Sequence, residues 1–202
     1  MRALSSRMVL LLIMALFTLP LVIAWMMYTG TIRFAPEHTR NLGRLVVPTV
    51  PVDWSGVIAS DGSPSKQLFD GFWVILYELP TSCTGYCLQL AAELRQVHVA
   101  SGLHRNRIRI ALLLAPEQAE SLGDELQGIY PRFNLVSHPD QRFFGALRHA
   151  SSNRSGRNDE PLMYLVDPLG NIMMTYNGKN SPSMLSKDLN RLLTWSKLDK
   201  RL

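Results

Sequence analysis

The chain of 202 residues is 47% hydrophobic and only 18% charged, a composition that predicts a folded core and excludes an intrinsically disordered chain. Its formal net charge of +5 is small, and its Lys and Arg residues are not clustered with aromatic side chains, which argues against a nucleic-acid-binding face. The length suits one ordinary domain with an appendage.

An uncharged apolar segment, residues 8–28, lies near the N-terminus. A helix of this length crosses a hydrocarbon core about 30 Å thick. A signal peptide is the alternative, but no small-x-small cleavage site follows, so we expect an uncleaved transmembrane anchor. Residues 1–7 would precede it, residues 29–50 would form a tether, and residues 51–202 would form the domain. Arginines flank the span on both sides, so local charge does not orient it.

Apolar periodicity predicts alternating strands and helices after the tether. A continuous apolar run, residues 72–79, is typical of a strand buried on both faces. We expect, in chain order, that strand, a helix from Cys87 to about Gly102, a strand at 107–114, a helix at 116–130, a strand at 133–137, a helix at 139–150, a loop at 151–160, hairpin strands at 162–167 and 171–177, and a helix at 181–198. This order predicts an α/β fold with a mixed sheet flanked by helices.

The only two cysteines, Cys83 and Cys87, directly follow the first buried strand. Their spacing puts them on one face of a helix. At a helix start, unpaired amide groups and the macrodipole favour a thiolate, which is nucleophilic, can be oxidised and ligates soft metals. The alternatives are a static disulfide and two inert buried cysteines, and the position of the pair favours a functional role.

The buried strand, the C-x-x-x-C of Cys83 and Cys87, and the stretch MYLVDPLGNIMMTY at 163–176 resemble the Sco/SenC family of cytochrome oxidase assembly proteins, within the thioredoxin-like superfamily. The likeness covers about residues 45–198. It implies a thioredoxin-like fold and a role in maturing the copper centre of cytochrome c oxidase. It also implies a single-pass anchor in the inner membrane, with the N-terminus in the cytoplasm and the domain in the periplasm.

In Sco proteins two cysteines and one histidine hold copper, so the resemblance makes Cys83 and Cys87 candidate Cu(I) ligands. The position of that histidine, eight residues before Asp167, is occupied by Asp159. A carboxylate is a hard ligand and a poor substitute for imidazole at a Cu(I) site. We expect the other histidines, including His98 in the helix after the cysteines, to be ordinary surface residues.

A proline, Pro161, stands six residues before Asp167. Many thioredoxin-like oxidoreductases carry a cis-proline at this offset, facing the cysteine pair, although a proline that merely closes the preceding loop is equally consistent. We expect Cys83 to be an exposed nucleophile that attacks a target disulfide, Cys87 to resolve the mixed disulfide, and Pro161 to shape the substrate groove. The expected function is thiol–disulfide chemistry in oxidase assembly. A Cu(I) chaperone and a non-catalytic accessory protein of the oxidase are the alternatives.

Overall fold

The computed structural model describes residues 5–29, 40–59, 62, 64, 66–80, 82–139, 141–151, 162–178 and 181–196. The chain divides into two compact units, residues 1–40 and residues 41–202.

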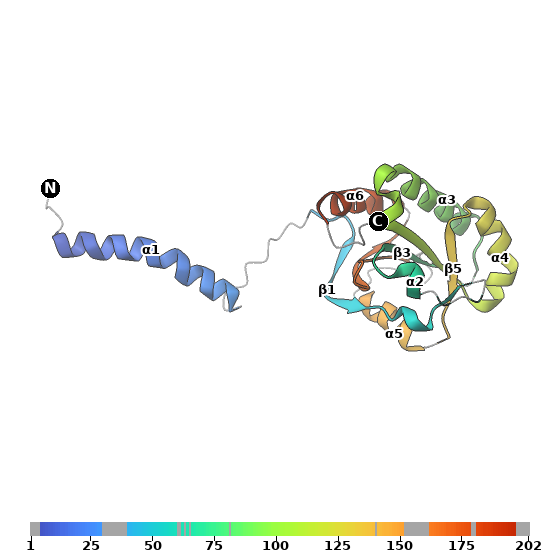
Figure 1. Cartoon of the computed structure of the whole chain (residues 1–202), viewed down its shortest axis with the longest axis horizontal. Coiled ribbons are helices and arrows are strands. Elements are labelled where there is room, and N and C mark those ends of the chain that lie inside the picture. The colour runs from blue at the N-terminus through green and yellow to red at the C-terminus, as the bar shows by residue number, and fades with distance from the viewer. Residues whose placement is uncertain are drawn as a thin grey trace. The chain divides into compact units, whose positions relative to one another are not determined.

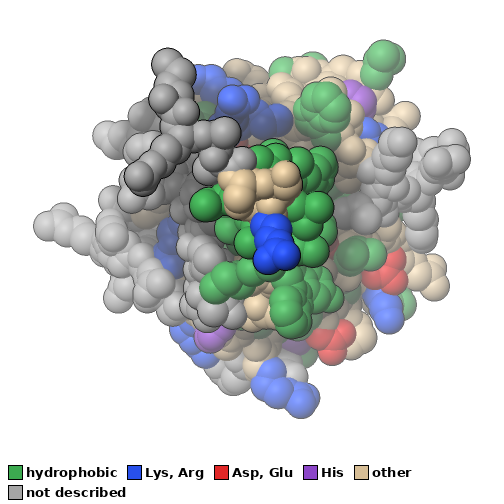
Figure 2. Space-filling view, turned by 90° about the vertical axis from the view of Figure 1, so that its left-hand side faces the viewer, with side chains coloured by type: hydrophobic (Ala, Val, Ile, Leu, Met, Phe, Trp, Pro, Cys, Tyr) green, Lys and Arg blue, Asp and Glu red, His purple; other side chains and the backbone are tan. Residues whose placement is uncertain are grey.

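The first unit contains helix α1, Ser6–Tyr28, which continues through Pro20. Its mean hydropathy is 2.6, and none of its residues is buried. Its large apolar side chains are exposed, and Figure 2 shows hydrophobic side chains gathered at the centre of one face. The helix is therefore long and apolar enough to cross a membrane, as the sequence predicts.

The second unit is built on one mixed sheet. Within the described residues its seven strands follow the order β1-β7-β6-β3-β4-β5-β2. The strands are β1 Arg44–Pro51, β2 Ile58–Ala59, β3 Trp73–Glu78, β4 Ile108–Leu113, β5 Phe133–Ser137, β6 Leu162–Val166 and β7 Asn171–Asn177. The helices are the 3-10 helices η1 Trp54–Gly56 and η2 Gly102–Arg107, and α2 Lys66–Phe69, α3 Gly85–Ala100, α4 Pro116–Ile129, α5 Gln141–Ala150 and α6 Ser181–Trp195. Strands β3, β4 and β5 are parallel, whereas β6 runs antiparallel to both of its neighbours, β3 and β7, so the predicted mixed sheet is confirmed.

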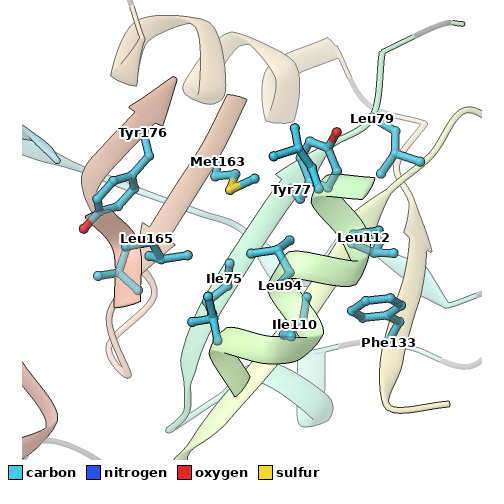
Figure 3. Close-up of a cluster of buried hydrophobic side chains, with 14 of the residues drawn as sticks. Ile75, Tyr77, Leu79, Leu94, Ile110, Leu112, Phe133, Met163, Leu165 and Tyr176 are labelled. Atoms are coloured by element: carbon cyan, nitrogen blue, oxygen red, sulfur yellow. The ribbon is translucent and has the colours of Figure 1, made fainter. Parts of the chain in front are cut away.

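Strand β3 lies between β6 and β4 and is covered on both faces (Figure 1). Its alternate side chains enter different apolar clusters, because successive residues of a strand point to opposite faces. Ile75 and Tyr77 pack on the side of α3 and α6, as Figure 3 shows around Leu94, whereas Val74 and Leu76 pack on the side of α5. This explains why β3 is apolar from Trp73 to Tyr77 rather than alternating between apolar and polar residues.

The folded unit begins earlier than the sequence predicts. Strand β1 pairs antiparallel with β7, and its side chains Val46 and Val50 are buried. The prediction that the tether extends to residue 50 is therefore wrong. Prolines, including Pro48, interrupt β1, and its pairing register shifts between Leu45 and Val50. The sequence therefore lacks the regular alternation of apolar and polar residues that would predict a strand. An edge strand tolerates such prolines because one of its sides needs no hydrogen bonds.

A buried carboxylate fixes the first residues of this unit. Asp188 on α6 is 2% exposed, and its Oδ2 accepts hydrogen bonds from the amides of Leu42 and Gly43, both at 2.8 Å. It also accepts a hydrogen bond from the Tyr176 hydroxyl at 3.2 Å, and Arg191 lies 3.8 Å away. Burial raises the pKa of Tyr176, and the Asp188 charge adds to that effect, so the phenol stays a donor. The network ties the start of the folded chain to β7 and α6.

We predict that Asp188→Ala lowers the free energy of unfolding by about 3 kcal/mol, because two amides and a hydroxyl lose their buried acceptor. Urea unfolding of the full chain in detergent micelles measures this. Asp124→Ala, which removes an exposed carboxylate from α4, is the matched control and should leave the midpoint unchanged. Equal losses in the two variants would contradict the role of Asp188.

Candidate redox site

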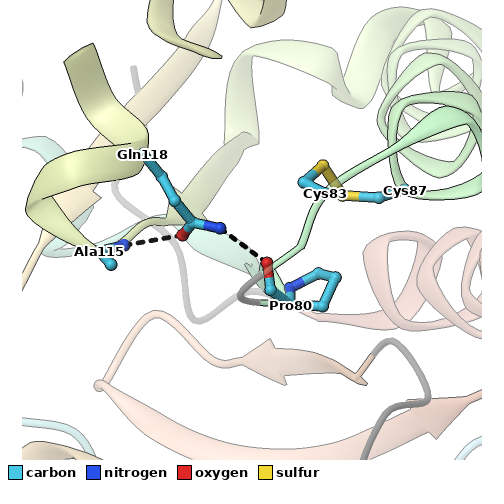
Figure 4. The surroundings of a disulfide bond; sticks show 5 residues. All are labelled: Pro80, Cys83, Cys87, Ala115 and Gln118. Carbon is cyan, nitrogen blue, oxygen red and sulfur yellow. Dashed lines mark hydrogen bonds between the residues drawn. A yellow bond between two sulfur atoms is a disulfide. The ribbon is translucent and has the colours of Figure 1, made fainter. Parts of the chain in front are cut away.

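The two cysteines lie immediately beyond the C-terminal end of β3. The Leu79 amide donates to the Leu113 carbonyl at 3.0 Å, so pairing with β4 extends one residue beyond the strand before the chain turns away at Pro80. Cys83 and Cys87 are joined by a disulfide, with their Cα atoms 5.2 Å apart (Figure 4). The central strand therefore places the pair at the end of the sheet where the parallel strands β3, β4 and β5 terminate.

Helix α3 begins between the two cysteines. Thr84 is its N-cap residue, and the Thr84 carbonyl accepts a hydrogen bond from the Cys87 amide at 2.7 Å. Cys87 therefore lies in the first turn, whereas Cys83 precedes the helix. The prediction that the pair lies at a helix start is correct. The two cysteines do not lie on one face of a helix, however, because Cys83 precedes the helix and the disulfide links it to the first turn. The macrodipole at this end favours a negative sulfur when the pair is reduced.

Both sulfur atoms lie at the edge of the apolar core. Cys83 is 9% exposed and Cys87 is 5% exposed, and both belong to the cluster that contains Leu79 and Leu90. The expectation that Cys83 is an exposed nucleophile is therefore wrong for the oxidised pair. Because the chain turns into α3 at this point, residues 84–86 lie on the surface while the cysteines on either side point inward.

The loop that carries Cys83 is held by Gln118, a residue that the sequence analysis did not identify. Gln118 is 8% exposed and lies in the first turn of α4. Its Oε1 accepts a hydrogen bond from the Ala115 amide at 3.0 Å, and its Nε2 donates to the Pro80 carbonyl at 2.7 Å (Figure 4). The only sequence signal was a Gln three residues after a helix cap position, where such side chains commonly bond back to the cap amide.

A second residue missed by the sequence analysis, Tyr77, belongs to the same apolar cluster as the cysteines. It is fully buried in β3, and its hydroxyl has no hydrogen-bond partner among the residues that the structure describes. Burial raises the pKa of Tyr77, and Tyr86, which lies between the two cysteines, adds to the shift. The phenol therefore stays protonated, as a buried donor near the C-terminal end of β3 for which the described part of the chain supplies no acceptor.

The remaining predicted site residues have different outcomes. Pro161 and Asp159 lie outside the described residues. His98 is 4% exposed, with its Nδ1 2.8 Å from the Tyr130 hydroxyl and its Nε2 3.0 Å from the Arg105 carbonyl, so the prediction of a surface histidine is wrong. Across the described ranges, no group of three or more His, Cys, Asp or Glu side chains could hold a metal ion.

A mixed sheet of this order, with a disulfide at the start of the helix that follows its buried central strand, is typical of a thioredoxin-like fold. A family model described as "Transmembrane-like, thioredoxin-like, C-terminal domain" matches residues 73–196. The match covers more than half of the chain, which therefore belongs to this family. A search of curated proteins finds no match.

Solved structures support the same fold at low sequence identity. Copper-bound ScoI of Arabidopsis thaliana is 17% identical, with a TM-score of 0.52 over 73% of this chain and 99% of that one. BsSco, described as a Sco-family cytochrome c oxidase assembly protein with a disulfide switch, is 15% identical, with a TM-score of 0.52 over 80% and 100%. A thiol:disulfide interchange protein from Bacteroides sp. is 16% identical, with a TM-score of 0.50 over 77% and 91%. These likenesses establish the thioredoxin-like fold that the sequence predicts.

We predict that Gln118→Leu lowers the free energy of unfolding by about 2 kcal/mol, because the Pro80 carbonyl and the Ala115 amide lose their partner. It should also speed reduction of the disulfide by dithiothreitol, since the loop before Cys83 is released. Gln89→Leu on the exposed face of α3 is the matched control. Unchanged stability and unchanged reduction in Gln118→Leu would show that the loop is held by other contacts.

Proposed function

We propose that this protein is a membrane-anchored thiol–disulfide exchange protein. The observation that carries the proposal is the Cys83–Cys87 disulfide across the N-terminus of α3, at the end of a central buried strand in a thioredoxin-like fold. A pair that encloses so short a loop contributes little to domain stability, so a purely structural staple explains it poorly. The helix N-terminus supplies what a reactive thiolate needs.

In the reduced chain, the Cys83 thiolate attacks one sulfur of a target disulfide. A bond forms between that sulfur and Cys83 Sγ, the target S–S bond breaks, and the departing target sulfur takes up a proton. The Cys87 thiolate then attacks Cys83 Sγ, re-forms the internal disulfide and releases the second target thiol. Two electrons pass from the chain to the target, and a dithiol donor protein returns the pair to its reduced state by the reverse exchange.

Because both sulfurs are nearly buried, exchange requires the surface turn at residues 84–86 to yield or to be displaced by the partner. Cys83 is the better attacking group for two reasons. It precedes the helix and is the more exposed residue of the two, whereas Cys87 is fixed within the first turn. These positions support the assignment of Cys83 as attacker and Cys87 as resolver.

The proposed target is the copper-accepting cysteine pair of a cytochrome c oxidase subunit. The Sco-type fold supports this proposal, because BsSco is described as an oxidase assembly protein with a disulfide switch. We further propose that α1 anchors the chain in the inner membrane and that the folded unit faces the periplasm, where disulfides form and persist. Pro161 is proposed as the residue that shapes the groove for the target.

We expect the reduced full chain in detergent micelles to release two coloured thiolates from 5,5′-dithiobis(2-nitrobenzoic acid) and to retain no adduct. Cys87→Ser should release one thiolate and retain a mixed disulfide at Cys83. Cys83→Ser should react at least about tenfold more slowly, because Cys87 is less exposed. Stopped-flow absorbance and intact-protein mass spectrometry measure both quantities. Equal rates and equal adducts in the two variants would refute the assigned roles.

The oxidase target is tested with the purified, oxidised copper-accepting domain of the subunit. Cys87→Ser should form a covalent complex with it, whereas a control domain that carries a surface disulfide far from the copper site should not be trapped. A pair that dithiothreitol cannot reduce in the native chain would overturn the exchange proposal and favour the accessory-protein alternative.

Cu(I) binding is the second candidate, because two adjacent thiolates are soft ligands that suit this ion. The disulfide must first be reduced, and the described residues provide no third ligand near the pair. We therefore expect the reduced chain to hold Cu(I) more weakly than a site with two thiolates and an imidazole. Competition with a chromogenic Cu(I) chelator measures this, and binding that survives in Cys83→Ser would exclude the cysteine pair as the site.

A further inference from the structure

A concave site lies at the opposite end of the folded unit from the disulfide. A cavity of about 350 Å³ is lined by His98, Asn106, Ile108, Arg109, Arg132 and Asn134. Because β3 and β4 are parallel, the start of β4 lies at the sheet edge opposite the one that carries the cysteines. The cavity is therefore separate from the redox chemistry, and its volume lies in the range typical of small-molecule sites.

One guanidinium group is held rigidly in this cavity. Arg109 lies 3.8 Å above the Phe72 ring centroid, and its Nη1 donates to the carbonyls of Asn106 and Ile108, both at 3.2 Å. Desolvation lowers the pKa of Arg109, and the nearby Arg132 charge adds to that effect. The side chain is oriented by its neighbours, and its remaining N–H groups are available for a ligand.

The second guanidinium carries charge that no described side chain neutralises. Arg132 is exposed in the turn before β5, and across the described ranges no carboxylate forms an ion pair with Arg132 or Arg109. Burial chiefly lowers the pKa of His98, and the charges of Arg132 and Arg105 add to the shift. The imidazole is therefore neutral. The positive charges that line the cavity are those of Arg109 and Arg132, and no described carboxylate pairs with either.

The polar groups beside these charges are also fixed. His98 has a hydrogen-bonded neighbour at each ring nitrogen, and Asn134 donates one Nδ2 hydrogen to the Ile110 carbonyl at 2.9 Å. The second Nδ2 hydrogen remains for a ligand. Two guanidinium groups that repel each other in a preformed polar cavity are stabilised by an oxyanion with several oxygens, such as a phosphate group, which their planar donors can bind in bidentate fashion.

We propose that this cavity is a binding site for a phosphate group carried by a small polar molecule. Arg132 and Arg109 would bind the phosphate oxygens, and Asn106 and Asn134 would contact the attached polar group. A free phosphate ester and the headgroup of a phospholipid share this chemistry. The site does not depend on the cysteine pair.

The test uses the full chain in uncharged maltoside micelles, titrated with glycerol 3-phosphate in a calorimeter at constant ionic strength set with chloride. We expect saturable binding that weakens about tenfold or more in Arg132→Gln, because a charge-assisted hydrogen-bond pair is lost. Arg148→Gln removes an exposed arginine from α5 on the other side of the sheet and should bind as the wild type does. Circular dichroism confirms that both variants fold.

Two results would overturn the proposal: no saturable binding by the wild type, or equal weakening in Arg132→Gln and Arg148→Gln. Two kinds of nanodisc of equal negative charge distinguish the two sources of phosphate. One is made of phosphatidylglycerol, which supplies a phosphate headgroup, and the other of galactolipid with a fatty acid, which supplies none. Loss of glycerol 3-phosphate binding only in phosphatidylglycerol identifies a lipid headgroup as the occupant. Binding retained in both identifies a soluble phosphate ester.

Discussion

The burial of β3 on both faces is the constraint on which the rest of the structure depends. A strand enclosed by helices on both sides cannot shift in register without moving an entire set of side chains into the wrong cluster. Its end is therefore fixed, and so is the point at which Pro80 turns the chain toward the helix. This strand therefore places the cysteine pair, and the Gln118 hydrogen bond to Pro80 and the packing of both cysteines in the apolar cluster hold it there.

The chemistry proposed for the pair follows from that placement. The disulfide bridges the N-terminus of α3, where backbone amides and the macrodipole stabilise a negative sulfur, yet both sulfur atoms point into apolar surroundings. Burial disfavours a charged thiolate while the helix end favours it, so the balance between the two sets the reactivity of the pair. Gln118 fixes the loop before Cys83, and the Tyr77 hydroxyl lies in the same apolar cluster as the cysteines with no acceptor among the described residues.

The two ends of the sheet have contrasting surroundings. At the carboxyl end of β3 the described environment of the disulfide is apolar. At the amino end of β4, arginines and asparagines line a cavity whose positive charges are not balanced by described carboxylates. Parallel strands explain this separation, because they bring all their starts to one edge and all their ends to the other.

The sequence by itself determined the apolar helix, the strand and helix order from residue 72, the mixed sheet and the position of Cys83 and Cys87 at a helix start. These features have local signals: an uncharged run, periodicity, and two cysteines directly after a buried strand. Only the tertiary structure decided that β1 joins the sheet, that both sulfurs are buried, and that Gln118 and His98 are internal. Each of these outcomes depends on contacts between segments far apart in the chain, and neither composition nor periodicity encodes which distant groups will meet.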